Sequence, residues 1–171
     1  MTQIAVRMAQ TPTDVDIARA LCREWLDWHW RAFPPDGPTD GNPMDPVTFE
    51  TVISNLPHIH ARPAGAILLA EVDGRPAGCV MYHAMEPGVA EIKRLFVNEN
   101  GRGRGLGRLL LEQMFAAMMT DGYQTVRFSS ARFLTDARRL YESVGFHDIA
   151  QPEGFPESFR DFVYFMERPL V

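Results

Sequence analysis

The segment with the strongest chemical signal is a turn rich in glycine and arginine, Arg102-Gly-Arg-Gly-Leu-Gly-Arg108. It follows a run of strand-forming residues and leads into an amphipathic helical pattern that starts at Leu106. The first N–H groups of a helix and its positive dipole end attract anions, and glycines let a phosphate approach the backbone closely. No acidic residue separates the three arginines. This turn is therefore a candidate site for a diphosphate.

Two common nucleotide-binding motifs do not fit this turn. The dinucleotide pattern G-x-G-x-x-G fails in every register because its last position falls on Leu106, Arg108 or Leu110, and no Gly-Lys-Ser/Thr of a P-loop occurs. The alternative is a flexible RNA-binding segment of the RGG type, which needs no following helix and suits a basic chain. This chain has 17 basic and 22 acidic residues, and its net charge of −5 argues against binding to nucleic acid or anionic lipid.

Hydrophobic periodicity predicts the elements that position the turn. Strand patterns cover residues 4–8, 66–72, 77–84, 90–97, 125–129, 146–149 and 161–167, and helical patterns cover about 14–32, 49–56, 106–121 and 136–144. Thr13 with Asp16 is expected to cap the first helix, and Thr135 the last one. The Pro- and Gly-rich residues 34–46 favour a long loop, and loops of that length often act as lids.

One strand pattern contains an irregularity. In residues 90–97 the apolar positions Ile92, Leu95 and Val97 break the period of two between 92 and 95. One extra residue in a β-bulge has this effect on the alternation of side chains. We therefore expect this strand to be kinked there, directly before the glycine-rich turn.

Two motifs in this order carry a family resemblance. The first is Arg102-x-x-Gly105-x-Gly107 after the strand Glu91-Ile-Lys-Arg-Leu-Phe-Val97. The second is the helix pattern Ala137-Arg-Arg-Leu-Tyr141-Glu-Ser-Val-Gly145-Phe146. Together they resemble the acetyl-CoA signature and the later helix of the GNAT superfamily of N-acetyltransferases, and the resemblance extends over essentially the whole chain.

The resemblance implies both a fold and an activity. The fold expected is a single α/β N-acetyltransferase domain over residues 1–171, with a mixed, mainly antiparallel sheet that is splayed at its centre and has helices on both faces. The activity expected is transfer of an acetyl group from the cosubstrate acetyl-CoA to a primary amine, by direct attack of the neutral amine on the thioester. No metal is implied.

The resemblance also implies how acetyl-CoA is bound. The backbone of the bulged strand would bind the pantetheine arm at Leu95, Phe96 and Val97, and the N–H of Leu95 would stabilise negative charge on the acetyl oxygen. The diphosphate would be held by the turn, at Arg102, Gly103, Arg104, Gly105, Leu106, Gly107 and Arg108. Family members often carry Asn where this chain has Leu134, so Ser129 or Ser130 would have to replace its contact with pantetheine.

Two residues are candidates for proton transfer. Strand alternation points Glu91 away from Ile92, where it could deprotonate the amine through a water; the alternative is an exposed carboxylate paired with Lys93 or Arg94. Tyr141, a phenol with an ordinary pKa of about 10, stays protonated at neutral pH and could donate its proton to the departing thiolate. The alternative for Tyr141 is a half-buried aromatic residue of the core.

Aromatic residues at the end of the first helix are candidates for contact with the acceptor. In the family the acceptor pocket tends to form near this helix and the following loop, so Trp25, Trp28 and Phe33 are expected to line it, and aromatic walls suit a ring or a cation. The alternative is that the tryptophans pack in the core. His58 and His60 form an isolated H-x-H, a second base or a metal pair by type, for which a polar loop is the alternative.

Composition bears on the compartment of the protein and on the partners it can bind. Cys22 and Cys79 have no companions at metal-ligand spacing, which argues against a disulfide framework and a zinc site. The longest apolar stretch, residues 64–70, is too short to span a membrane, and the first 16 residues lack the apolar core of a signal peptide. We therefore expect a cytoplasmic protein, and the family resemblance implies an acceptor that is a small molecule or a peptide. Two alternatives stay open: an acyl-CoA-binding sensor without transfer, and an interaction domain or homodimer that uses the Trp-rich helix as its surface.

Overall fold

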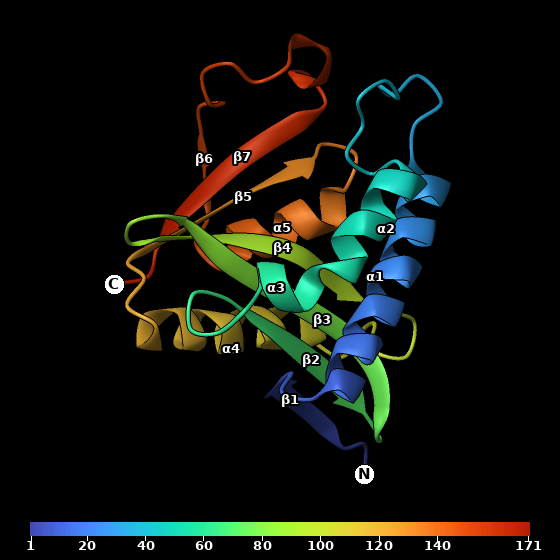
Figure 1. Ribbon diagram of the computed structural model, residues 1–171, viewed down its shortest axis with the longest axis vertical. Coiled ribbons are helices and arrows are strands. Elements are labelled where there is room, and N and C mark those ends of the chain that lie inside the picture. Colours follow the sequence, from blue (N-terminus) through green and yellow to red (C-terminus); the bar gives the residue numbers. More distant parts are fainter.

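Seven strands form one mixed sheet in the computed structural model, which describes residues 1–171 (Figure 1). The strands are β1 (Ile4–Met8), β2 (Ala66–Val72), β3 (Arg75–Glu86), β4 (Val89–Val97), β5 (Thr125–Ala131), β6 (His147–Ile149) and β7 (Val163–Pro169). Their order across the sheet is β1-β2-β3-β4-β5-β7-β6, and every neighbouring pair is antiparallel except β4 and β5. The expected mixed, mainly antiparallel sheet is confirmed.

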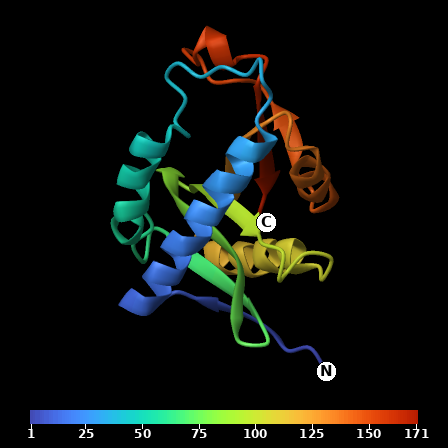
Figure 2. The same ribbon diagram turned by 90° about the vertical axis from the view of Figure 1, so that its right-hand side faces the viewer.

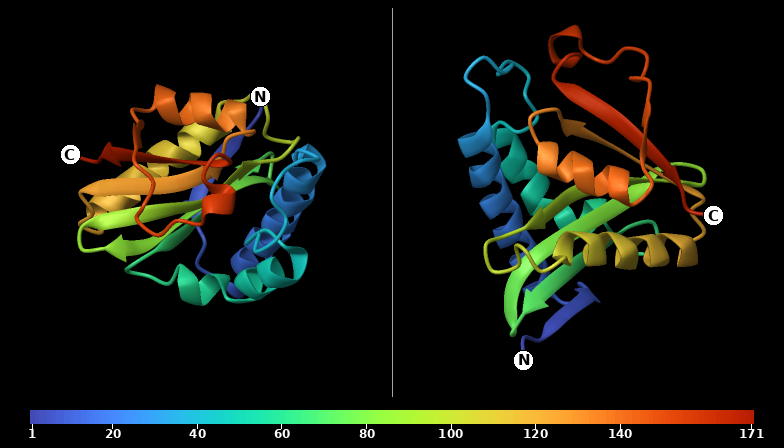
Figure 3. Two further views of the ribbon diagram at one scale, coloured as in Figure 1. Left: turned by 90° about the horizontal axis from the view of Figure 1, so that it is seen from above. Right: turned by 180° about the vertical axis from the view of Figure 1, so that it is seen from behind.

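Helices cover both faces of this sheet, as expected. The helices are α1 (Pro12–Ala32), α2 (Pro46–Ser54), α3 (Leu56–Ile59), α4 (Leu106–Thr120) and α5 (Thr135–Ser143), and a short 3-10 helix, η1 (Glu157–Phe159), precedes β7. Figure 2 shows α1 crossing the sheet on the same side as α2. Figure 3 shows α4 and α5 together on the opposite side.

Each face of the sheet has its own apolar core. Under α4 and α5, buried side chains of α4 such as Leu110 and Met114 pack against strands β2 to β5. Under α1 and α2, Leu21 and Phe49 pack against Met81 and other side chains of the opposite face. Because β2 and β3 are covered on both faces, their sequences are nearly continuous apolar runs rather than alternating ones.

The central strands β4 and β5 part after a short paired stretch. They pair only over Val89–Glu91 of β4 and Thr125–Arg127 of β5. Beyond these residues β4 continues to Val97 and β5 to Ala131 without pairing to each other. The half of the sheet made of β5, β7 and β6 therefore turns away from the half made of β1 to β4 (Figure 1). The expected splayed centre is confirmed.

A β-bulge in β4 lies at this opening. Cys79 of β3 pairs with Phe96 and Met81 pairs with Lys93, so β4 contains one residue more than β3 between the two pairs. Arg94 lies in this stretch, and its φ of +58° is in the left-handed region. The bulge expected between residues 92 and 95 is therefore confirmed.

The bulge decides which face each side chain of β4 reaches. Ile92 and Leu95 pack on the core under α4 and α5. Phe96 belongs to the core under α1 and α2, and the guanidinium group of Arg94 lies over the Phe49 ring in that same core. Because the extra residue interrupts the alternation, Arg94 projects to the face opposite Leu95 although Ile92 and Leu95 share a face.

The first helix starts two residues earlier than expected. Thr11 caps α1: its hydroxyl oxygen accepts the N–H of Asp14, and the Asp14 carboxylate accepts the N–H of Thr11. Asp14 also forms an ion pair of 2.7 Å with Arg7 of β1. The expected cap of Thr13 and Asp16 is therefore wrong. Thr11 and Asp14 have the same spacing, and Pro12 at the start of the helix favours the earlier beginning.

Two further helix boundaries differ from expectation. The helix expected over residues 49–56 is two helices, α2 and α3, because Pro57 lies in the first turn of α3, where proline is tolerated, instead of ending a helix. Thr135 is the first residue of α5 and not its cap; the N-cap is Leu134, which offers no side-chain hydrogen bond. The first turn of α5 therefore lacks a side-chain cap.

We expect the two threonines at the start of α1 to differ in their contribution to stability. Thr11→Ala removes the hydroxyl that accepts the Asp14 N–H and should lower the free energy of unfolding by about 1 kcal/mol. Thr13→Ala, on the exposed side of the same helical turn, should change it by less than about 0.5 kcal/mol. Urea unfolding of the two variants checks this, and equal losses would contradict the observed cap.

Candidate active site

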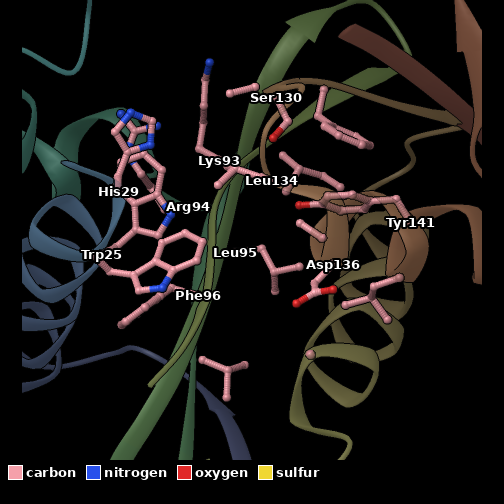
Figure 4. Close-up of a pocket in the computed structure, with 18 of the residues that line it drawn as sticks. Trp25, His29, Lys93, Arg94, Leu95, Phe96, Ser130, Leu134, Asp136 and Tyr141 are labelled. Carbon is pink, nitrogen blue, oxygen red and sulfur yellow. The ribbon is translucent and has the colours of Figure 1, made fainter. Parts of the chain in front are cut away.

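A cavity of about 910 Å³ occupies the opening between β4 and β5 (Figure 4). Its walls come from β4, β5, the end of α1, the start of α4, and α5. Figure 4 shows Trp25, His29 and Arg94 on one side of β4, and Leu95 and Tyr141 on the other. The cavity therefore connects the two faces of the sheet through the gap that the parted strands leave.

The glycine-rich turn forms the end of the cavity next to α4. Gly105 is the N-cap of α4 with a φ of +73°, and it provides no side chain to cap the first N–H groups of the helix. A Cβ atom on Gly107 would lie 2.9 Å from the side chain of Leu140, so this glycine lets α4 approach α5 closely. Gly105 thus suits its backbone conformation, and Gly107 avoids a close contact with the end of the Leu140 side chain.

The arginines of the turn are not neutralised by the protein. Arg102 and Arg104 donate through Nε to backbone carbonyls, and Arg108 donates to the Ser143 hydroxyl at 2.8 Å. None of the three forms a salt bridge. Three free guanidinium groups beside a helix N-terminus suit a ligand with several phosphate charges.

Most of the residues expected to bind the cosubstrate lie together in the cavity wall. The strand residues and the turn residues that line it are Leu95, Phe96, Val97, Arg102, Gly103, Gly105, Leu106, Gly107 and Arg108. Arg104 belongs to the same turn but does not line the cavity. Leu134, Ser129 and Ser130 line the facing wall, so both serines are near the position where the family often has asparagine.

Tyr141 lies across the cavity from β4. Its ring packs against Phe128, with ring centroids 3.9 Å apart, and against Phe146, so the residue is only 6% exposed. Its hydroxyl group points across the cavity towards β4 (Figure 4). Burial raises the pKa of this phenol above its ordinary value, so the hydroxyl keeps its proton. Tyr141 is therefore part of the core, and its protonated hydroxyl group faces the cavity; its role as an acid stays a prediction.

Glu91 lies beside the cavity and not in its wall. Its carboxylate is 2.7 Å from Lys93 Nζ and 3.3 Å from His83 Nε2. Burial alone would raise the pKa of Glu91, but the His83 hydrogen bond and the Lys93 charge outweigh it and lower the pKa to about 2. The same carboxylate raises the pKa of His83. The ion pair with Lys93 is thus present, and the role of Glu91 as a base stays a prediction.

Aromatic side chains form the end of the cavity next to α1. Trp25, Trp28 and Phe33 all line it, as expected. Phe33, Phe133 and Phe162 contact one another at ring-centroid distances of 5.4–5.8 Å and so join three segments over this end. The tryptophans pack against the core under α1 and are half-buried. The alternative of an interaction surface on this helix stays a prediction.

The long loop over residues 34–46 borders the same end of the cavity. Asn42, Pro43 and Met44 belong to the wall. The indole N–H of Trp30 donates to the carbonyl of Met44 at 2.8 Å, which ties the loop to α1. The loop that the sequence marks as a candidate lid thus lies next to the aromatic wall.

His29 and Arg94 are among the residues of the cavity wall that the sequence did not predict. His29 is 4% exposed, neither ring nitrogen has a hydrogen-bond partner, and burial lowers its pKa to about 4. Arg94 points its guanidinium group to the same end of the cavity (Figure 4). The sequence offered one signal for Arg94, a cation next to the break in the strand pattern, and none for His29.

The isolated histidine pair does not form a site. His60 is buried, with Nδ1 2.9 Å from the carbonyl oxygen of Tyr82, whereas His58 is exposed. No three His, Cys, Asp or Glu side chains are close enough to hold a metal ion. No helix of the protein is both long enough and apolar enough to cross a membrane.

Comparison with known proteins identifies relatives by sequence. Residues 22–146 match the model of the acetyltransferase (GNAT) family. An uncharacterized N-acetyltransferase of Schizosaccharomyces pombe is 30% identical over 150 residues, which cover 85% of this chain and 83% of that protein. The N-acetylaspartate synthetase of Xenopus tropicalis is 27% identical over 93 residues, which cover 54% of this chain but only 34% of that protein.

A solved structure shares the fold. The PaiA N-acetyltransferase of Thermoplasma acidophilum, solved in complex with coenzyme A, has a TM-score of 0.70 and 16% identity, over 98% of this chain and 99% of that one. The match to the family model covers well over half of the chain, and the splayed sheet and the glycine–arginine turn agree with it. The chain therefore belongs to the GNAT family and is an acetyl-CoA-dependent N-acetyltransferase.

Proposed function

We propose that the cavity binds acetyl-CoA from the side of α4 and α5 and the amine acceptor from the side of α1 and α2. The thioester and the amine would then meet at the bulge of β4. The observation that carries this proposal is that the cavity is continuous. It is lined by the glycine-rich turn (residues 102–108, here called the arginine turn), by Tyr141 and by the aromatic wall of α1. Two substrates of different shape can thus reach one point from opposite faces of the sheet.

Acetyl-CoA fits this arrangement through its charge and its extended shape. Its diphosphate would lie against the first N–H groups of α4, with Arg102, Arg104 and Arg108 supplying positive charge. Its pantetheine arm would run along the edge of β4 at residues 95–97, which β5 leaves unpaired. Ser129 and Ser130 on the facing strand would supply hydrogen bonds that Leu134 cannot make.

In the proposed reaction the neutral amine attacks the acetyl carbon, a C–N bond forms and the C–S bond breaks. The backbone N–H of Leu95 at the bulge would donate to the acetyl oxygen, where negative charge develops. Tyr141 would donate its proton to the departing thiolate and regain a proton from solvent. Its position across the cavity from β4 supports this assignment.

We also propose that Glu91 receives the proton of the ammonium group through a water. The carboxylate lies on β4 three residues before Arg94 and is ionised at neutral pH. Because its pKa is low, it would hold the proton only briefly. His83, which contacts the carboxylate at 3.3 Å, would first release its own proton to solvent and then take up the proton from Glu91.

The whole chain would work as one acetyltransferase domain, since strands from both ends of the chain belong to one sheet. Its acceptor would be a small molecule or a peptide that presents a primary amine. Cys22 and Cys79 are buried free thiols, which suit a reducing compartment, and we propose the cytoplasm as the place of action.

Substitution of Gly105 tests the diphosphate site. Gly105→Glu places bulk and negative charge where two anionic groups would lie, and it should weaken coenzyme A binding by at least about 100-fold. Gly122→Glu is the matched control, because Gly122 lies at the other end of α4 and has a similar φ, +89° against +73°, with no atom close to its Cβ position. Calorimetry should show unchanged affinity for the control; an equal loss in both variants would refute the assignment.

Removal of one hydroxyl tests Tyr141. Tyr141→Phe should lower kcat by about 10- to 1000-fold and leave affinity for acetyl-CoA nearly unchanged, because only the proton donor is lost. Tyr164→Phe is the control: this ring lies in the same core, its hydroxyl is buried without a partner, and it does not line the cavity. An acetyl donor with a more acidic thiol should restore part of the rate in Tyr141→Phe. Equal sensitivity of variant and native enzyme to the thiol pKa would exclude Tyr141 as the acid.

The pH dependence of the rate tests Glu91. Glu91→Gln should lower kcat/KM by about 100-fold at neutral pH, and the loss should shrink at high pH, where the amine is already deprotonated. Glu86→Gln serves as control, because Glu86 pairs with Arg127 outside the cavity wall. A loss in Glu91→Gln that is the same at every pH would show that Glu91 acts only through structure.

A further inference from the structure

We propose that the acceptor carries a carboxylate close to its amine and that Arg94 binds this carboxylate against the rings of Trp25 and Phe49. The inference rests on the proposed function of the cavity and names the chemical class of its acceptor. Free amino acids belong to this class. The side chain of such an amino-acid substrate would then face the aromatic wall, which includes Trp28 and Phe33.

Arg94 is a cation for which the protein supplies no anion. The carbon at the centre of its guanidinium group lies 4.8 Å from the ring centroid of Phe49 and 5.7 Å from that of Trp25. It takes part in no salt bridge, and its Nε is the one arginine nitrogen that is buried without a hydrogen-bond partner. Since an arginine stays charged and this half-buried guanidinium group has no counter-ion in the protein, an anionic partner from outside the chain is expected.

The surrounding charges favour an anion at this place. The carboxylate nearest along the strand, Glu91, is engaged by Lys93 at 2.7 Å and by His83 at 3.3 Å. Lys93 and Arg94 both line the cavity, whereas Glu91 does not. An anionic group that enters from the aromatic end therefore meets a wall with excess positive charge. A planar guanidinium group offers paired N–H donors, which match the two oxygens of a carboxylate.

The position of Arg94 limits the distance between the carboxylate and the amine. Arg94 directly precedes Leu95, whose N–H would hold the acetyl oxygen, so the anion site and the reacting centre are adjacent. The phosphates of acetyl-CoA would be at the arginine turn, beyond Val97, and about 10 Å of strand separates Val97 from Arg94. Arg94 is thus available to the acceptor and not to the diphosphate.

The backbone supports the same conclusion. The bulge holds Arg94 at a φ of +58°, a conformation that favours glycine, and turns its side chain to the face of α1 and α2. A strained backbone and an unpaired cation both oppose folding. Their coincidence in the wall of a cavity indicates a function in binding.

The test compares acceptors that differ by one carboxylate. L-phenylalanine, L-leucine and L-methionine are each paired with the amine that lacks the carboxylate, such as 2-phenylethylamine, and thiol release from acetyl-CoA is measured. The native enzyme should prefer the amino acids in kcat/KM. Arg94→Gln should reduce this preference by about 10- to 100-fold, and Arg94→Lys should reduce it less. The control is Arg168→Gln, since Arg168 also lies over a ring, that of Phe115, but does not line the cavity.

A binding measurement that needs no turnover separates this inference from the proposed function. In the presence of coenzyme A, phenylacetate should bind the native protein and Arg168→Gln, and bind Arg94→Gln at least about 10-fold more weakly, whereas neutral phenylacetamide should not distinguish the variants. Arg94-dependent phenylacetate binding without acetylation of any amine would support the inference and count against the proposed function. The inference would be overturned, and the proposed function would stand, if both members of each pair were acetylated with equal kcat/KM. The same conclusion would follow if native protein and Arg94→Gln bound phenylacetate equally well.

Thermal unfolding of the same variants excludes a merely structural role. Arg94 has no ion-pair partner in the protein and would lose only its contacts with the Phe49 and Trp25 rings, so Arg94→Gln should melt within a few degrees of the native protein. A lower melting temperature together with unchanged phenylacetate binding would show that Arg94 serves the fold.

Discussion

The short pairing between β4 and β5 is the constraint on which the rest of this structure depends. Only Val89–Glu91 and Thr125–Arg127 are paired, and both strands continue beyond them. A longer parallel pair would close the cavity and occupy the free edge of β4. Because the strands part, backbone groups of β4 are available to an extended ligand. The same opening connects the two faces of the sheet.

The bulge then gives the two faces different chemistry. It keeps Leu95 on the side of α4 and α5, where Tyr141 and the arginine turn lie, and it moves Arg94 to the side of α1 and α2. Cations thus line the cavity at two separate places, Arg94 at one and the arginines of the glycine-rich turn at the other. The arrangement keeps these cations apart in space although Arg94 and Arg102 are close in sequence.

The parts of the site that could be predicted are those fixed by local chemistry. Gly105 must adopt a positive φ at the start of α4, and the position of Tyr141 on α5 follows from the spacing of one motif. The helix caps were less predictable. Thr11-x-x-Asp14 and Thr13-x-x-Asp16 have the same spacing, so spacing alone does not choose between them; in the structure Thr11 caps α1 and Asp14 also pairs with Arg7 of β1.

The sequence by itself determined the periodicity of the strands and helices, the break in β4 and the glycine–arginine turn, since each depends on residues within one or two turns of chain. Only the tertiary structure decided that Arg94 lacks a partner, that His29 is buried without hydrogen bonds and that Glu91 is held by His83. Burial and charge pairing depend on which distant segments meet. The surroundings of Arg94 and His29 are therefore set by the packing of α1 and α2 on the sheet, which no local pattern contains.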